Sequence, residues 1–126
     1  MSPANLAPLL ERFFLQRLMQ ERRVSPHTIA SYRDTFCRLL KFAQQRLHMG
    51  PSKLQFEQIT APLIGKFLDH LEQHDGVSVR TRNLRLTAIH SFFRYVALEE
   101  PTQALLCQRI LAIPAKRHQR RNPFPG

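Results

Sequence analysis

The chain has 126 residues, enough for one domain with its own hydrophobic core. Nineteen lysines and arginines against nine acidic residues give a formal net charge of +10 at pH 7, a balance that favours a polyanionic partner, most often nucleic acid. No apolar stretch is as long as a membrane span, and the N-terminal stretch lacks the basic start of a signal peptide. Cys37 and Cys107 are expected to be reduced thiols in a cytoplasmic protein.

Apolar residues recur at three- and four-residue intervals along the chain, which is typical of helices. The pattern predicts five helices, over residues 4–22, 26–48, 61–73, 79–98 and 102–112. Ser25, Thr60 and Ser78 are expected to cap the second, third and fourth helices, because serine and threonine hydroxyls accept hydrogen bonds from free N–H groups there. No stretch alternates as a strand does, so the predicted fold class is all-α, a small four- to five-helix bundle.

Positive charge is concentrated in the second and fourth helices and in the C-terminal tail. The predicted fourth helix carries Arg80, Arg82, Arg85 and Arg94 without an acid, and the tail carries Lys116 and Arg117 among further basic residues without one. Basic side chains often only solvate a helix face, but such a face usually mixes signs. The acid-free fourth helix and tail therefore favour a surface for a polyanion, and we expect the tail to be flexible.

The arginines at the start of the fourth helix pose a packing problem. On a helical wheel Arg82 and Arg85 lie on the same arc as core residues such as Leu86 and Ile89. A guanidinium is almost never buried unpaired. We therefore expect the first turn and a half of this helix to project beyond the core, where both arginines can meet a ligand.

The residue types at this helix start suit DNA. A helix N-terminus favours phosphate, arginine and asparagine pair with base edges in the major groove, and hydroxyl groups take phosphate oxygens. The stretch "SVRTRNLR" combines a helix N-terminus, arginine and asparagine side chains, and hydroxyl groups. The stretch "SPHT" at the start of the second helix offers more phosphate contacts. The candidates from these two stretches are Ser78, Arg80, Thr81, Arg82, Asn83 and Arg85, with Ser25, His27 and Thr28.

Two longer stretches carry a family likeness. "SPHTIASYRDTFCRLLKFA" resembles the S-x-x-T-x-x-x-Y-x-x-x-L…F segment of tyrosine recombinases, or phage integrases, and "SVRTRNLRLTAIHSFFRYVA" is similar to their later T-x-x-R-x-L-x-A-x-R-x-F-F-x-Y helix. The resemblance covers roughly residues 4–101 and implies the N-terminal core-binding, SAM-like domain. In that family this domain forms half of a C-shaped clamp around the recombination site, with helices crossing the major groove.

The resemblance implies particular residue roles. It places DNA contacts at Thr28, Arg33 and Lys41 on the second helix and at Thr81, Arg82 and Arg85 on the fourth. It implies that Tyr32 and Tyr95 pack inside. His90 stands where the family often has arginine, so no contact is carried over to it. The expected organisation is a core-binding domain at 4–101, an additional helix at 102–113, and a basic linker or tail at 114–126 that includes Lys116 and Arg117.

In the tyrosine recombinase family, the catalytic residues lie in a second domain that carries the tyrosine nucleophile. The resemblance therefore implies DNA binding by a truncated or partial recombinase without strand exchange of its own. His118 and Arg121 have the spacing of the catalytic H-x-x-R motif, but no tyrosine follows them and we assign no catalytic residue. The expected partners are double-stranded DNA and other recombinase protomers, with no cofactor, membrane or small-molecule substrate.

Other interpretations stay open. His70 and His74, near Asp69 and Glu72, have a spacing that would suit a metal, but no second ligand cluster accompanies them and a solvated acidic helix is favoured. The apolar surface of the first and fifth helices would suit a helical protein–protein interaction module. A stand-alone DNA-binding regulator is the third possibility, although the long second helix and the long connection after it differ from a compact helix-turn-helix.

Overall fold

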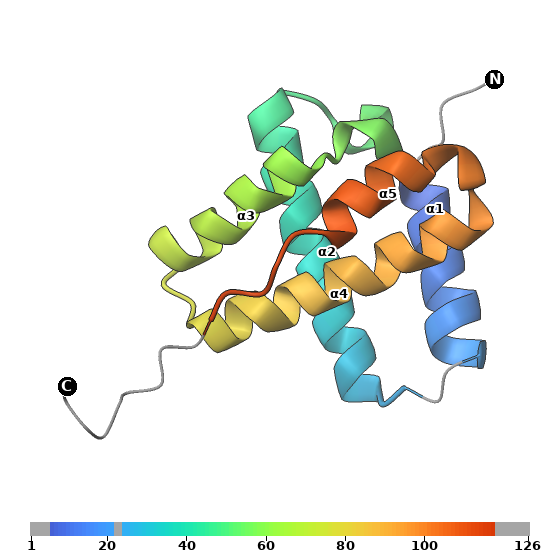
Figure 1. Ribbon diagram of the computed structural model, residues 1–126, viewed down its shortest axis with the longest axis horizontal. Helices are drawn as coiled ribbons and strands as arrows, with labels where there is room; N and C mark the ends of the chain where they lie inside the picture. Colours follow the sequence, from blue (N-terminus) through green and yellow to red (C-terminus); the bar gives the residue numbers. More distant parts are fainter. Residues whose placement is uncertain (1–5, 22–23, 118–126) are drawn as a thin grey trace.

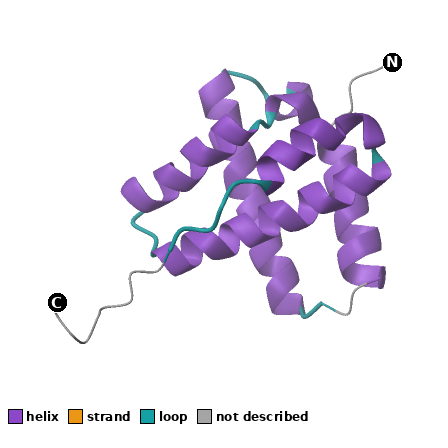
Figure 2. Ribbon diagram, viewed as in Figure 1, coloured by secondary structure: helices purple, strands orange, loops and turns teal. Residues whose placement is uncertain are grey.

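The computed structural model describes residues 6–21 and 24–117, and its regular elements are all helical (Figures 1 and 2). They are α1 (Leu6–Arg12), the π-helix η1 (Phe13–Glu21), α2 (Pro26–Leu47), the short 3₁₀ turns η2 (Pro51–Lys53) and η3 (Phe56–Gln58), α3 (Ala61–Gln73), α4 (Val79–Glu99), the 3₁₀ turn η4 (Pro101–Gln103) and α5 (Ala104–Leu111). The predicted all-α class is confirmed. None of the described helices is long and apolar enough to span a bilayer.

Side-chain caps fix where three helices begin. Ser25 accepts a hydrogen bond from the backbone N–H of Thr28 at 3.2 Å, and Ser78 accepts one from that of Thr81 at 3.1 Å. Thr60 caps α3 in the same way. Each cap satisfies an N–H group that the helix itself leaves unpaired, which favours a helix start at that residue. The three helices therefore begin where the sequence predicts.

The first helix differs from the uninterrupted α-helix predicted over 4–22. From Phe13 onward the backbone winds as a π-helix. Phe13 and Leu18, five residues apart, are 0% and 1% exposed. An α-helix would turn these two side chains to different faces, whereas i to i+5 winding places them on one face. The wider winding thus lets both side chains enter the core.

The helices pack around a cluster of phenylalanine rings. Figure 1 shows α2 crossing behind α4, with α1 and α3 on opposite sides of the crossing. Phe92 on α4 is the centre of the cluster, and its ring centroid lies between 5.1 and 6.4 Å from those of Phe13, Phe36, Phe56 and Phe93. The predicted inward position of Tyr95 is confirmed by its 4% exposure, and Tyr32 is half-buried.

The helix α5 contributes to the same core. It runs alongside α4, with Cys107 and Ile110 completely buried. His90 on α4 forms a hydrogen bond of 3.0 Å with the carbonyl oxygen of Ile110. The segment predicted as an additional helix therefore closes one side of the bundle.

Candidate nucleic-acid interface

Arg85 joins α4 to α2 where the two helices cross. Its Nη2 lies 2.8 Å from Asp34 Oδ2, and its Nη1 donates to Thr35 Oγ1 at 3.0 Å and to the Ser31 carbonyl oxygen at 3.4 Å. The side chain is only 16% exposed. Asp34 also accepts a hydrogen bond from Arg38 Nε at 2.9 Å. The hydrogen bond from Arg38, reinforced by Arg85, holds the pKa of Asp34 below its ordinary value.

Arg82 joins the start of α4 to α3. Its Nε lies 3.3 Å from Glu72 Oε1, an ion pair without hydrogen-bond geometry, and its side chain is 11% exposed. Its Nη1 donates to Asn83 Oδ1 at 3.0 Å and to the carbonyl oxygen of Pro114 at 3.5 Å. The prediction that this end of the helix projects beyond the core is therefore wrong. Sequence reasoning missed Asp34 and Glu72, the acids on neighbouring helices that pair with the two arginines.

Residues 114–117, here called the strap, lie along the first half of α4 (Figure 1). Asn83 Nδ2 donates to the Lys116 carbonyl oxygen at 2.8 Å, and the Lys116 backbone N–H donates to Asn83 Oδ1 at 2.9 Å. Lys116 Nζ also donates to Glu72 Oε2 at 2.8 Å. The expected flexible tail is therefore wrong for these four residues. Residues 118–126, including His118 and Arg121, lie outside the described residues.

The predicted hydroxyl contacts have local roles in the structure. Ser25 Oγ and Thr28 Oγ1 lie 3.0 Å apart, and Ser78 Oγ donates to Thr81 Oγ1 at 3.2 Å. These pairs belong to the caps of α2 and α4. They also leave two hydroxyl groups together at each helix start, with His27 exposed beside the first pair.

The remaining predicted cations are distributed over different parts of the surface. Lys41 on α2, Arg80 on α4 and Arg117 in the strap are exposed, and none of them forms an ion pair within the described part of the chain. Arg33 lies over the Phe14 ring at 5.8 Å, on the side of α2 that faces η1. The structure therefore does not bring Arg33 together with Arg85.

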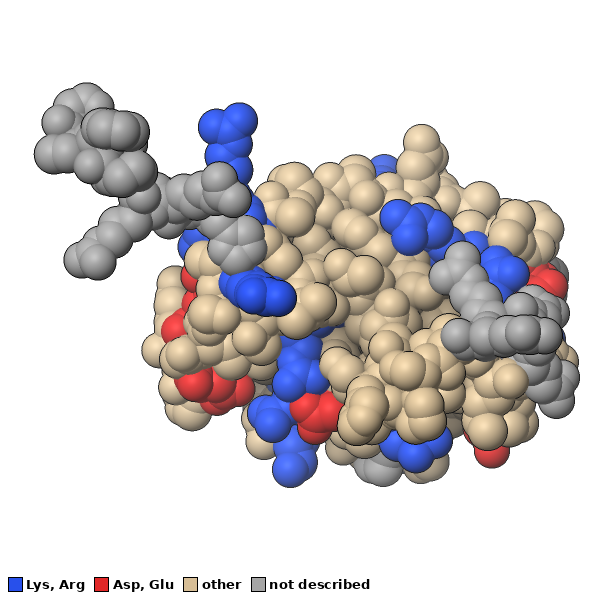
Figure 3. Space-filling model, turned by 90° about the horizontal axis from the view of Figure 1, so that it is seen from below, with Lys and Arg blue, Asp and Glu red and all other residues tan. Residues whose placement is uncertain are grey.

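Figure 3 looks at the end of the molecule where α2 begins. Lysine and arginine atoms gather there in several separate groups with uncharged surface between them, and acidic atoms appear beside the lower central basic group and toward the left and right edges. The basic groups on this face therefore do not form a continuous band. Such an arrangement suits contacts to phosphates spaced along a polyanion rather than a single small anion.

The fold is thus an all-helical, basic domain in which α2 and α4 cross. Residues 11–100 match the family model described as phage integrase, N-terminal SAM-like domain. The chain belongs to this family, as the resemblance of its two motifs implied, and no solved structure matches it.

Three relatives illustrate the relationship. The protein named "Putative integrase/recombinase y4rC" of Sinorhizobium fredii is 68% identical over 117 residues, which cover 93% of this chain and 35% of the relative. A second, y4rD of the same organism, is 46% identical, covering 89% of this chain and 40% of the relative. The tyrosine recombinase XerC of Shigella flexneri is 26% identical, covering 86% of this chain and 35% of the relative. The chain thus spans between 35% and 40% of the length of these relatives.

Proposed function

We propose that this chain binds double-stranded DNA as the core-binding domain of a site-specific tyrosine recombinase, and that its residues do not themselves perform strand exchange. Membership of the phage integrase family supports the first part. The structural observation that most supports DNA binding is the positive charge at the α2–α4 crossing. There the single carboxylate of Asp34 is shared by Arg38 and Arg85, so the cluster keeps a net positive charge.

Exposed cations extend this charge. Lys41 follows Arg38 by one turn on α2, and Arg80 lies in the first turn of α4. We assign them, with Arg117, the direct phosphate contacts, because each is exposed and unpaired among the described residues. Arg82, Arg85 and Asn83 then act as positioning residues that hold α4 against its neighbours.

Two helix starts complete the proposed surface. Backbone N–H groups at a helix N-terminus and nearby hydroxyl groups favour phosphate oxygens. Ser25, His27 and Thr28 would contact the backbone at the start of α2, and Ser78 and Thr81 would do so at the start of α4. Arg33 lies over Phe14 on another side of α2, so we favour it less than Lys41 and Arg80 as a phosphate contact.

A salt titration tests this proposal. Fluorescent duplex DNA is titrated with the wild-type chain, with Lys41→Gln/Arg80→Gln, and with the control Lys53→Gln/Arg109→Gln, which removes two exposed charges from η2 and α5. Counterion release gives a slope of log K against log salt of roughly −0.9 per phosphate contacted. We expect the first variant to lose affinity and about 1.8 of this slope, and the control to keep both.

Either of two results would overturn the proposal. One is that the wild-type chain does not bind duplex DNA at about 100 mM salt, where phosphate contacts still contribute substantially. The other is that both variants lose the same affinity, since binding would then depend on total charge alone. Strand cleavage by the chain would contradict the second part of the proposal.

An apolar groove favours a second candidate function, contact with another protein such as a neighbouring recombinase protomer. It lies between α1, η1 and α2, has a volume of about 380 Å³, and is lined by Leu10, Phe14, Leu15, Met19, Phe36 and Leu40 among others. Leu15 and Met19 are 53% and 58% exposed. Sedimentation with and without DNA tests it: the charge-neutral change Leu15→Gln/Met19→Gln should abolish any self-association while DNA affinity stays unchanged.

A further inference from the structure

Three potential metal ligands converge at the end of α3. His70 and His74 stack with ring centroids 4.6 Å apart and ring planes within 12°. Asp75 Oδ1 lies 3.0 Å from His74 Nδ1 and 4.0 Å from His70 Nε2. These ligand atoms all lie within 4.8 Å of one another, and residues 6–21 and 24–117 contain no other such group of three.

We propose that His70, His74 and Asp75 form a binding site for a divalent transition metal ion such as Zn²⁺. Two imidazole nitrogens and one carboxylate oxygen are the donor set that suits zinc, nickel or copper, whereas magnesium and calcium require oxygen ligands. Three protein ligands leave a fourth position for water. Small side-chain adjustments bring ligand atoms at these separations to a common ion.

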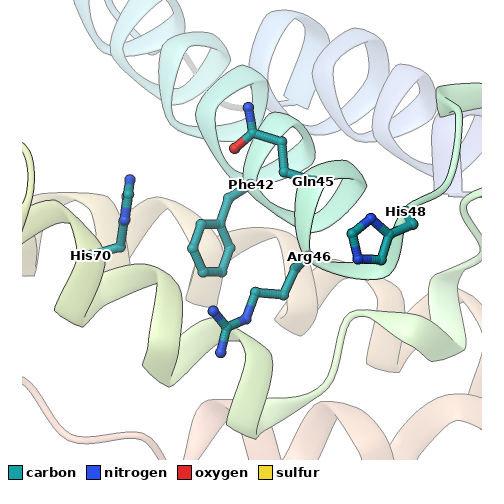
Figure 4. Close-up of a pocket in the computed structure, with 5 residues that line it drawn as sticks. All are labelled: Phe42, Gln45, Arg46, His48 and His70. Carbon is teal, nitrogen blue, oxygen red and sulfur yellow. The ribbon is translucent and has the colours of Figure 1, made fainter.

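The surrounding structure holds the site in place. The His70 ring packs against Phe42 of α2 with centroids 5.2 Å apart, and Figure 4 shows Phe42 between His70 and Arg46. Asp75 is fixed through its backbone, because its N–H donates to the His70 carbonyl oxygen at 3.2 Å. Gly76 follows with φ of +68°, a conformation that favours glycine and turns the chain toward α4. Two of the three ligands are therefore positioned before an ion arrives.

The charges near the site limit its affinity without excluding an ion. Arg38 and Lys41 line the same hollow of about 340 Å³ as the three ligands, and both repel a cation. Arg38 is engaged by Asp34 at 2.9 Å, which offsets part of this repulsion. We therefore expect weaker binding than the same three ligands would give without neighbouring cations.

The sequence did not single out Asp75. It placed Asp69 and Glu72 near the histidine pair, whereas Glu72 is engaged by Arg82 and Lys116 on another side of α3. Asp75 becomes a ligand only because the chain turns at the end of α3. An ion bound there would link the last turn of α3 to the loop before α4, and would slow hydrogen exchange of the loop amides at residues 75–77.

Cobalt and zinc binding to the whole 126-residue chain tests the proposal. Visible absorption of Co²⁺ and calorimetry with Zn²⁺ are compared for wild type, His74→Ala and Asp75→Asn, whose altered side chains lie at the surface. The controls are His27→Ala and Cys37→Ser, which remove an exposed histidine and an exposed thiol elsewhere. Circular dichroism verifies that each variant is folded.

The expected result is one bound ion, with Co²⁺ absorption bands from inner-sphere ligands and Zn²⁺-dependent protection of residues 75–77. Each ligand variant should lose at least tenfold in affinity, since even outer-shell changes cost roughly 10- to 100-fold, and the two controls should bind as wild type does. The proposal is overturned if wild type binds no ion, if the ligand variants bind as tightly as wild type, or if His27→Ala or Cys37→Ser weakens binding equally.

Discussion

Replacing Arg85 by methionine separates a structural role of this arginine from a DNA-contacting one. Methionine keeps most of the apolar stem but removes the guanidinium that binds Asp34, Thr35 and the Ser31 carbonyl oxygen. If Arg85 holds α4 to α2, the variant loses stability in the absence of DNA. If Arg85 instead projects toward a ligand, its loss leaves the free domain as stable as before.

The contacts of Arg85 set the expected size of the effect. The hydrogen bond from its charged donor to Thr35 contributes about 1.5 kcal/mol. The pair with Asp34 contributes only about 0.5 kcal/mol, because the Asp34 side chain is 47% exposed and solvent screens it. Thr35, 1% exposed, is not orphaned, since its hydroxyl also donates to the Ser31 carbonyl oxygen at 3.0 Å. The free energy of unfolding should therefore fall by about 2 kcal/mol, and Tm by roughly 6–10 °C for a domain of this size.

Urea unfolding followed by far-UV circular dichroism measures the difference. Arg80→Met is the matched control, because Arg80 lies on the same helix, is exposed, and has no ion pair among the described residues. Its free energy of unfolding should stay within about 0.5 kcal/mol of wild type. Equal stability of Arg85→Met and Arg80→Met would refute the assignment of Arg85 as a link between helices.

Three further predictions concern other contacts. Asn83→Ala removes both hydrogen bonds to Lys116, so exchange of the Lys116 amide hydrogen should accelerate about tenfold; unchanged exchange would show that Asn83 does not hold the strap. Ile110→Ala should lower the free energy of unfolding by about 2–4 kcal/mol, because Ile110 is completely buried; a wild-type urea midpoint would mean that α5 is dispensable. The pKa of Asp34 is lowered in the folded state, chiefly by the hydrogen bond from Arg38. The ionised Asp34 carboxylate therefore stabilises the fold at pH values above its unfolded pKa. This contribution to the free energy of unfolding is lost as the pH falls through the folded pKa. Wild type should therefore be more stable than Asp34→Asn at pH 7 but not at pH 2, as urea midpoints at the two pH values will test.

The helix boundaries were predictable because their signals are local. The serine before Pro26, and the cap residues Thr60 and Ser78, mark helix starts by chemistry that acts within three residues. The phenylalanine positions of α4 were predictable for a similar reason, since helical periodicity alone separates a buried face from an exposed one. The π-winding of η1 was not, because spacings of three, four and five residues all occur between its apolar residues.

The partners of the site residues were not predictable. A helical wheel locates Arg82 and Arg85 on a buried arc, but only the packing of α2 and α3 reveals that Asp34 and Glu72 meet them. The helical wheel correctly showed that these arginines lie on a buried arc and need partners. The prediction that the helix projects beyond the core to expose them was wrong. The partner of Asn83 is a stretch of backbone, which leaves no pattern of residue types in the sequence.

The pairing between Asn83 and Lys116 has a consequence for which substitutions the strap tolerates. Both hydrogen bonds use main-chain atoms of residue 116, so nearly any amino acid there can keep them, with or without the lysine's contact to Glu72. Proline is the exception, because it has no N–H to donate. Position 83 has no such freedom: aspartate cannot donate, and leucine can neither donate nor accept. Substitutions at position 116 other than proline should therefore keep both hydrogen bonds, while a single change at Asn83 on α4 would remove them together.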